Sequence, residues 1–123
     1  MSVIANTPKP PYFAVIFTST RTQGDHGYDA MANTMVELAA KQLGFLGIES
    51  ARVEVGITVS YWSDIESIKQ WKMNTEHLHA QTLGRKSWYS SFKVRISKVE
   101  RDYGFLSIKK VAKNNLMKKN SKN

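Results

Sequence analysis

Residues 57–71 read ITVSYWSDIESIKQW, and the pattern of this stretch changes halfway along it. Its first half is rich in β-branched and aromatic residues, which is typical of a strand. Its second half places Ser63 three residues before Glu66, the spacing at which a hydroxyl and a carboxylate satisfy the free amides of a helix start. Apolar residues then recur at helical spacing: Ile65, Ile68 and Trp71. The stretch therefore predicts a strand that leads directly into a helix.

The same two patterns extend toward the N-terminus. Residues 12–20, YFAVIFTST, form a run of strand length, and residues 28–43 carry apolar side chains at the spacing of a helix of about four turns. Gly44 suits the end of that helix. The segment GFLGIES that begins there is expected to be a loop, because its two glycines permit backbone conformations closed to other residues. A short strand is expected at residues 51–54.

Toward the C-terminus, the second helix is expected to break at residues 74–76, where the polar run NTE can cap a new helical segment that ends at Gly84. Residues 88–105 alternate apolar and polar positions over much of their length. This alternation predicts a long final strand, bulged near Ser90 and Ser91.

The predicted order is strand, helix, strand, strand, helix, strand. This order is typical of an α+β, ferredoxin-like split β-α-β fold with a four-stranded, mainly antiparallel sheet and both helices on one face. Apolar positions in the first and last strands are expected to supply the other face, and a two-fold dimer with sheets packed face to face would bury it. We divide the chain into a leader (1–11), this domain (12–105) and a basic C-terminal tail (106–123).

Composition excludes several classes of site. The chain of 123 residues has no cysteine, which removes disulfides, thiolate nucleophiles and cysteine-containing metal sites.

The net charge is +8, but residues 105–123 hold six lysines and no acid, so residues 1–104 hold only +2. A frayed, solubilising tail is the expectation, and a basic amphipathic helix that contacts nucleic acid or an anionic membrane is the alternative. With no signal peptide pattern and no long apolar run, we expect a cytoplasmic protein.

Four segments carry a family resemblance: GFLGIES, YWSDIESIKQW, EHLHAQTLGRKSWY and the later VERDY. Together they resemble the antibiotic biosynthesis monooxygenase (ABM) family over about residues 12–105. The resemblance implies a dimeric α/β barrel of ferredoxin-like subunits, each with a pocket between sheet and helices. It also implies oxidation of a small aromatic or quinone-like compound with dioxygen and no cofactor, neither metal nor flavin. A homodimer and a small hydrophobic ligand are the partners that it suggests.

The resemblance also proposes site residues. Trp71 matches a family position that lines the pocket and positions the substrate, and His77 can move a proton because imidazole titrates near neutral pH. Arg85 can hold an anionic oxygen. The remaining candidates for contacts with the substrate are Phe17, Ser19, Met35 and Trp62. Structural roles remain open for these residues: core packing for the tryptophans, local hydrogen bonds for His77 and a solvated position for Arg85.

Two departures from the family pattern restrict the activity. Haem-degrading relatives pair a first-strand asparagine with a histidine ten residues after the pocket tryptophan, whereas this chain offers Thr18, Ser19 and Thr20 in the strand and Gln81 on the helix. Haem degradation is therefore disfavoured. The missing asparagine also leaves open a non-catalytic dimer of the same fold that binds a ligand or is purely structural. No metal site is expected, because His77 and His79 stand two apart and thus on different sides of a helix.

Overall fold

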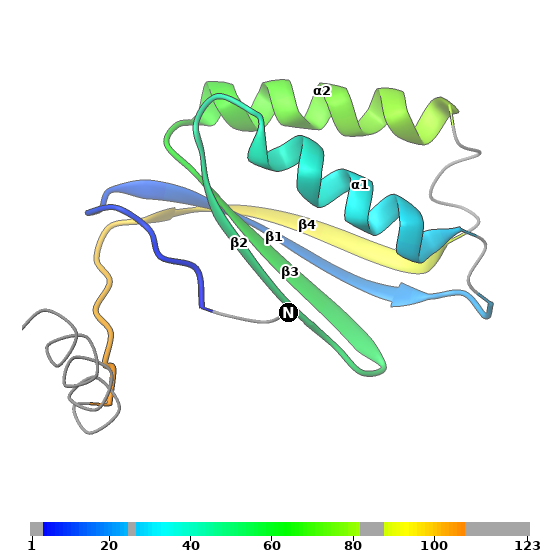
Figure 1. Ribbon diagram of the computed structural model, residues 1–123, viewed down its shortest axis with the longest axis horizontal. Helices are drawn as coiled ribbons and strands as arrows, with labels where there is room; N and C mark the ends of the chain where they lie inside the picture. The colour runs from blue at the N-terminus through cyan, green and yellow to red at the C-terminus, as the bar shows by residue number, and fades with distance from the viewer. Residues whose placement is uncertain (1–3, 25–26, 82–87, 108–123) are drawn as a thin grey trace, which may run out of the picture.

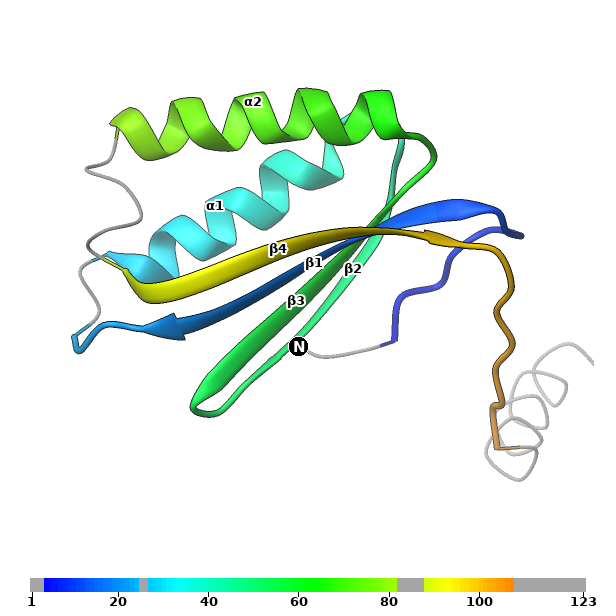
Figure 2. The same ribbon diagram turned by 180° about the vertical axis from the view of Figure 1, so that it is seen from behind.

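Four strands and two helices make up the computed structural model, which describes residues 4–24, 27–81 and 88–107. In chain order the elements are β1 (Tyr12–Arg21), α1 (Tyr28–Ala40), β2 (Phe45–Arg52), β3 (Val55–Trp62), α2 (Ile65–Gln81) and β4 (Tyr89–Val99). The strands form one antiparallel sheet in the order β2-β3-β1-β4. Both helices lie on the same side of this sheet, as Figures 1 and 2 show from opposite directions. This confirms the ferredoxin-like α+β prediction.

The two faces of the sheet differ in their cover. Trp62 of β3 stacks on Trp71 of α2, so the side chains that share the side of Trp62 form what we call the helix face. Directly opposite residues of paired strands point to the same side. From β2 to β4, the helix face therefore includes Arg52, Ser60, Trp62, Phe13, Phe17, Ser19, Phe92, Val94 and Ile96. We call the other side the open face.

This register corrects one expectation about the open face. The apolar positions of β4 were expected to supply it with hydrophobic side chains, but Phe92, Val94 and Ile96 lie on the helix face. The open-face positions of the same strand are mostly polar, among them Lys93 and Arg95. The alternation was correctly read, but its phase is set by the pairing with β1, which the sequence of β4 alone does not contain.

The boundaries of three elements differ from the predictions. The segment GFLGIES is not a loop, because β2 already begins at Phe45, and only Gly44, with a φ of +86°, makes the turn. The helix α1 ends at Ala40 instead of residue 43. The helix α2 runs through residues 74–76 without the expected break: the Thr75 hydroxyl donates to the Lys72 carbonyl (2.8 Å), and the Asn74 amide donates to Gln42 of the α1–β2 connection (3.0 Å).

Two smaller features concern helix capping and the last strand. The side chain that caps α2 belongs to Asp64, whose Oδ1 accepts a hydrogen bond from the Ser67 amide at 2.7 Å, and this bond holds the pKa of the Asp64 carboxyl below its usual range. The predicted cap residue was Ser63. The strand β4 ends at Val99 and not at residue 105, while its expected bulge is present as a register shift opposite Thr20 and Arg21.

The leader covers one end of the open face. The Ala5 amide donates to Glu49 Oε1 (2.8 Å), and the Tyr61 hydroxyl donates to Glu49 Oε2 (2.9 Å). Burial, and next this bond, raise the pKa of Tyr61 to about 12. The Tyr12 hydroxyl donates to Asp102, beyond β4, and this bond is the main reason why the pKa of Tyr12 is raised.

No helix among the described residues is long and apolar enough to span a bilayer.

Candidate functional site

The helix face leaves an apolar wall incompletely covered. Phe92, Val94 and Ile96 of β4 point toward the helix layer, yet 39%, 46% and 53% of their surfaces stay exposed. Large apolar side chains on the covered side of a sheet are normally buried. Their exposure therefore leaves an apolar surface on the helix face that an apolar ligand can contact.

A stack of aromatic rings supports the other side of this face. The rings of Trp62 and Trp71 are 5.9 Å apart with planes 28° from parallel, and Phe45 meets Trp62 edge-on at 5.4 Å. Trp62 is fully buried, and its indole N–H donates to the Ser60 hydroxyl (2.9 Å). Trp71 is only half-buried. Trp62 therefore has no free donor and supports Trp71, which is the more accessible of the two.

Phe17 lies between this stack and the wall of β4. Its ring stacks on Phe92, with centroids 5.4 Å apart, and meets Tyr89 edge-on at 5.3 Å. Met35 is half-buried on α1. The candidate residues of β1 and β3 thus share one face of the sheet, and this face is the one beneath the two helices.

Ser19 has a partner that the sequence analysis did not single out. It is 2% exposed, and its hydroxyl accepts a hydrogen bond from Arg52 Nη2. Arg52 stands at the end of β2, and its guanidinium reaches β1 by crossing β3 at Gly56, where a β-carbon would overlap it. The only signal in the sequence is a glycine opposite an arginine across a hairpin, which becomes visible only once the register is known.

A second arginine and two tyrosines lie beside Arg52. The Arg21 guanidinium carbon is 3.6 Å from the centre of the Tyr28 ring, and that of Arg52 is 6.0 Å from the same ring. Arg21 also donates to the carbonyls of Trp88 (2.9 Å) and Gly24 (3.1 Å). Burial, and next a hydrogen bond to Tyr28, raise the pKa of Tyr89, although the two arginines act in the opposite direction. Two guanidinium groups therefore lie close together at this end of the helix face.

Two predicted site residues are not placed by these contacts. His77 lies on α2, but its side chain is outside the described residues, and so is the whole of Arg85. Among the residues that the structure describes, no group of three His, Asp or Glu side chains is arranged to hold a metal ion.

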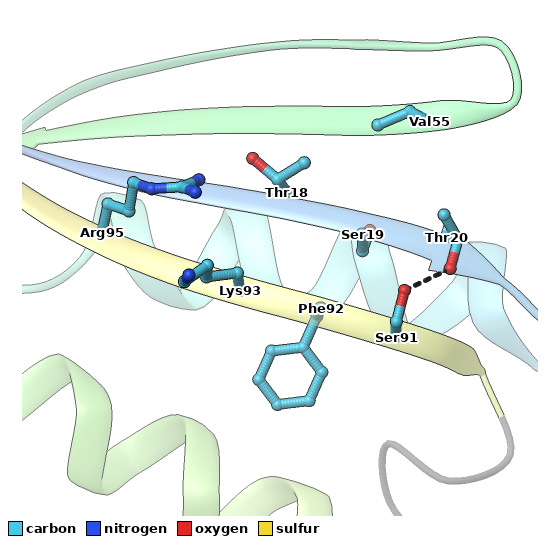
Figure 3. A pocket seen from close by; sticks show the side chains of 8 residues that line it. All are labelled: Thr18, Ser19, Thr20, Val55, Ser91, Phe92, Lys93 and Arg95. Carbon is cyan, nitrogen blue, oxygen red and sulfur yellow. Dashed lines mark hydrogen bonds between the residues drawn. The ribbon is translucent and has the colours of Figure 1, made fainter.

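The open face carries a groove of its own. It has a volume of about 350 Å³ and lies over the ends of β1 and β4, where Thr18, Thr20, Ser91, Lys93 and Arg95 line it (Figure 3). The Thr20 hydroxyl lies 2.6 Å from that of Ser91. In Figure 3 the Phe92 ring points away from this group, toward α2. These side chains lie on the opposite face of the sheet from the candidate site, although Ser19 and Phe92 also border the groove.

Comparison with known proteins agrees with the predicted family. Residues 19–97 match the profile of a family described as monooxygenase af470-like. A Bacillus subtilis (strain 168) protein, named uncharacterized protein YqjZ, is 50% identical over 103 residues, which are 82% of this chain and 90% of that protein.

Two solved structures share the fold. SnoaB, a cofactor-independent oxygenase from Streptomyces nogalater, superposes with a TM-score of 0.58 at 12% identity, over 80% of this chain and all of that one. A candidate antibiotic biosynthesis monooxygenase from Chloroflexus aurantiacus J-10-fl superposes with a TM-score of 0.54 at 18% identity, over 76% of this chain and 96% of that one. At these identities the likeness concerns the fold alone.

Proposed function

The chain belongs to the monooxygenase af470-like family, and on that premise we propose that it oxidises a small aromatic or quinone-like compound with dioxygen, without metal or flavin. The reaction takes place between the helix face and the two helices. The observation that carries this proposal is the exposed apolar wall of Phe92, Val94 and Ile96 beneath the helix layer. An apolar recess lined by a few polar groups is the usual form of a small-molecule site.

An anthrone-type substrate illustrates the chemistry. Its activated CH₂ group loses a proton, and the resulting electron-rich anion reduces dioxygen directly. One oxygen atom of O₂ becomes the new carbonyl, the other leaves as water with the two hydrogens of the CH₂ group, and the substrate supplies all four electrons. The protein then has only to bind the substrate, stabilise its anion and move protons.

The proposed roles follow from these needs. Trp71 positions the aromatic substrate, with Trp62 beneath it as support, and His77 moves the proton. Phe17 and Met35 provide apolar contacts, Arg85 holds a developing negative charge, and Ser19 takes part through its hydroxyl group. Of these groups, Trp71 is the one whose removal tests the proposal most simply, because it is half-buried and stacks on the supporting ring of Trp62.

We propose in addition that two copies pack through their open faces to form the dimeric α/β barrel. In a single chain, Val55 and Ile57 of β3 are exposed on this open face. Apolar side chains in the middle of a sheet are costly to leave in water, and an identical copy can cover them. The open-face side chains of β4 are mostly polar, so this interface combines apolar and polar contacts.

Turnover of anthrone in air tests the activity. The purified protein is expected to consume dioxygen and form the quinone in equal amounts, at a rate above that of buffer. Trp71→Ala is expected to lower kcat/KM by about 10–100-fold through loss of positioning. Tyr103→Ala removes an aromatic ring that is fully exposed and outside the helix face, and it should leave the rate unchanged. Absence of turnover with a panel of anthrone-type phenols, or an unchanged rate in Trp71→Ala, would contradict the proposal.

One observation favours a non-catalytic ligand carrier as the second candidate. Ser19 stands in the strand where oxygenases of the ABM family use an asparagine, and its hydroxyl is already engaged by Arg52. Under this alternative, anthrone and the corresponding quinone would quench tryptophan fluorescence on binding while no dioxygen is consumed. Binding together with turnover would exclude the carrier role.

A further inference from the structure

The guanidinium of Arg52 is held in place from three sides. It lies across β3 in the space that Gly56 leaves free, donates through Nη2 to Ser19 of β1, and faces the ring of Tyr28 at the start of α1. An arginine at the end of a strand ordinarily extends into solvent. Here the fold instead positions the head group on the helix face.

One nitrogen of this head group lacks a partner. Arg52 Nη1 is buried, and no described residue accepts a hydrogen bond from it. A buried donor without an acceptor is destabilising, more so when it carries charge, and arginine cannot relieve the cost by losing its proton. Among the described residues, Arg52 Nη1 is therefore left without a hydrogen-bond acceptor.

In the described part of the chain, the groups that contact Arg52 itself carry no negative charge. The groups that face it are the hydroxyl of Ser19, the ring of Tyr28 and, farther away, Arg21 and Tyr89. Tyr89 stays a neutral phenol at pH 7, because its pKa is raised. Two cations thus lie at the end of the helix face where Phe92 begins the apolar wall.

We propose that Arg52 Nη1 is the anchor for an anionic oxygen, a carboxylate or phenolate, on the aromatic ligand of this site. The inference rests on the proposed function, because it assumes that an aromatic compound enters the helix-face space. It adds the class of that compound: an aromatic acid or phenol bound as its anion. A charge-assisted bond from Nη1 would satisfy the free donor, while Nη2 keeps its bond to Ser19.

Binding of a matched pair of probes to the full-length protein tests the anchor. The probes are 2-naphthoate and methyl 2-naphthoate, which share their ring system and differ in charge, and binding is followed by tryptophan fluorescence or calorimetry. The protein is expected to bind the acid about tenfold more tightly than the ester, as one hydrogen bond to a charged group predicts. Arg52→Gln should abolish this preference and leave the affinity for the ester unchanged.

The control is Arg95→Gln, which removes the same charge from the open face and should keep the preference. Gly56→Ala provides a second variant: it retains Arg52 but places a β-carbon where the guanidinium lies, so it should also reduce the preference. If Arg52→Gln does not fold, two measurements still test the anchor: the acid-to-ester affinity ratio of Gly56→Ala and that of the unaltered protein.

Each outcome separates the anchor from the proposed function. Equal binding of acid and ester by the unaltered protein, or a preference that survives Arg52→Gln, overturns the anchor and leaves the aromatic site standing. Loss of the preference in Arg95→Gln instead of Arg52→Gln assigns the anion to the open-face groove and also overturns it. If neither probe binds at millimolar concentration, the anchor and the aromatic site both fail.

Discussion

Arg52 takes its position from residues that are distant in the sequence. Nothing near it in the chain distinguishes it from a solvated cation, and only the pairing of β2, β3 and β1 places Gly56 beneath it and Ser19 beyond it. The contact between Trp62 and Trp71, by contrast, is local, because a strand that leads directly into a helix brings residues nine apart onto one face. Contacts within one junction can be predicted from sequence, whereas those across several strands cannot.

Gly44 is a glycine that the structure requires. Its φ is +86°, and a β-carbon there would overlap the side chain of Ser67 at the start of α2. Gly44→Ala should therefore lower the free energy of unfolding by about 1–2 kcal/mol for the backbone and by roughly 1–3 kcal/mol more for the overlap. Gly27 is the matched control: its φ is +80° with open space around it, so Gly27→Ala should cost only the backbone contribution. Urea unfolding measures both, and equal losses would contradict the close packing at Gly44.

Tyr61 predicts how the protein responds to alkali. Its pKa is raised to about 12, from an ordinary value of 10, by burial and by the bond to Glu49. A raised pKa in the folded state means that this contribution to stability is fully present below pH 10 and is lost as pH rises toward 12. Tyr61→Phe should make stability less dependent on pH in that window, as circular dichroism across an alkaline series can measure. An unchanged dependence would show that the phenol does not titrate with folding.

At the scale of elements, the sequence predicted which segments are strands and helices better than where they end. The strand at residue 12 and the helix at residue 28 begin where the pattern places them. The start of β2 was missed because two glycines in GFLGIES suggested a loop, although pairing with β3 extends the strand to Phe45. The break in α2 was wrong because Asn74 and Thr75 find hydrogen-bond partners that keep the helix intact.

The N-terminal cap of α2 offers a prediction at this scale. Asp64 accepts the hydrogen bond from the Ser67 amide, so Asp64→Ala should destabilise the protein, whereas Asp64→Asn retains an accepting oxygen and should do so less. The pKa of Asp64 is lower in the folded protein than its ordinary value. The stability that the charged carboxylate contributes is therefore present above the ordinary aspartate pKa, and it is lost as the pH falls through the lowered pKa. Thermal melts of both variants at neutral and acid pH measure this. Equal melts of the alanine variant and the unaltered protein would contradict the cap.

For the molecule as a whole, the two faces of the sheet determine where a ligand and a second copy can bind. The helix face combines an apolar wall with Arg52, whose Nη1 has no acceptor among the described residues, and the open face combines exposed β3 side chains with a groove lined by hydroxyls and two cations. A ligand on the helix face and a partner copy on the open face do not compete for surface. The sequence suggested this division, but it assigned the apolar side of β4 to the wrong face because the pairing register was not known.

Light scattering tests the dimer. The unaltered protein should have twice the 14.0 kDa mass of the chain at micromolar concentration. Ile57→Lys introduces a charge in the middle of the open face and should yield the monomer mass. Val53→Lys is the control, since Val53 is 93% exposed at the tip of the same hairpin. A monomer mass for the unaltered protein would contradict the face-to-face arrangement.

The most direct test of where the chemistry takes place is a crystal structure of the protein with 2-naphthoate bound. Density for the naphthyl ring beside Phe92 and Phe17, with the carboxylate against Arg52 Nη1, is the predicted result. Density in the open-face groove at Lys93 and Arg95, or a helix face filled solidly by side chains, would contradict it.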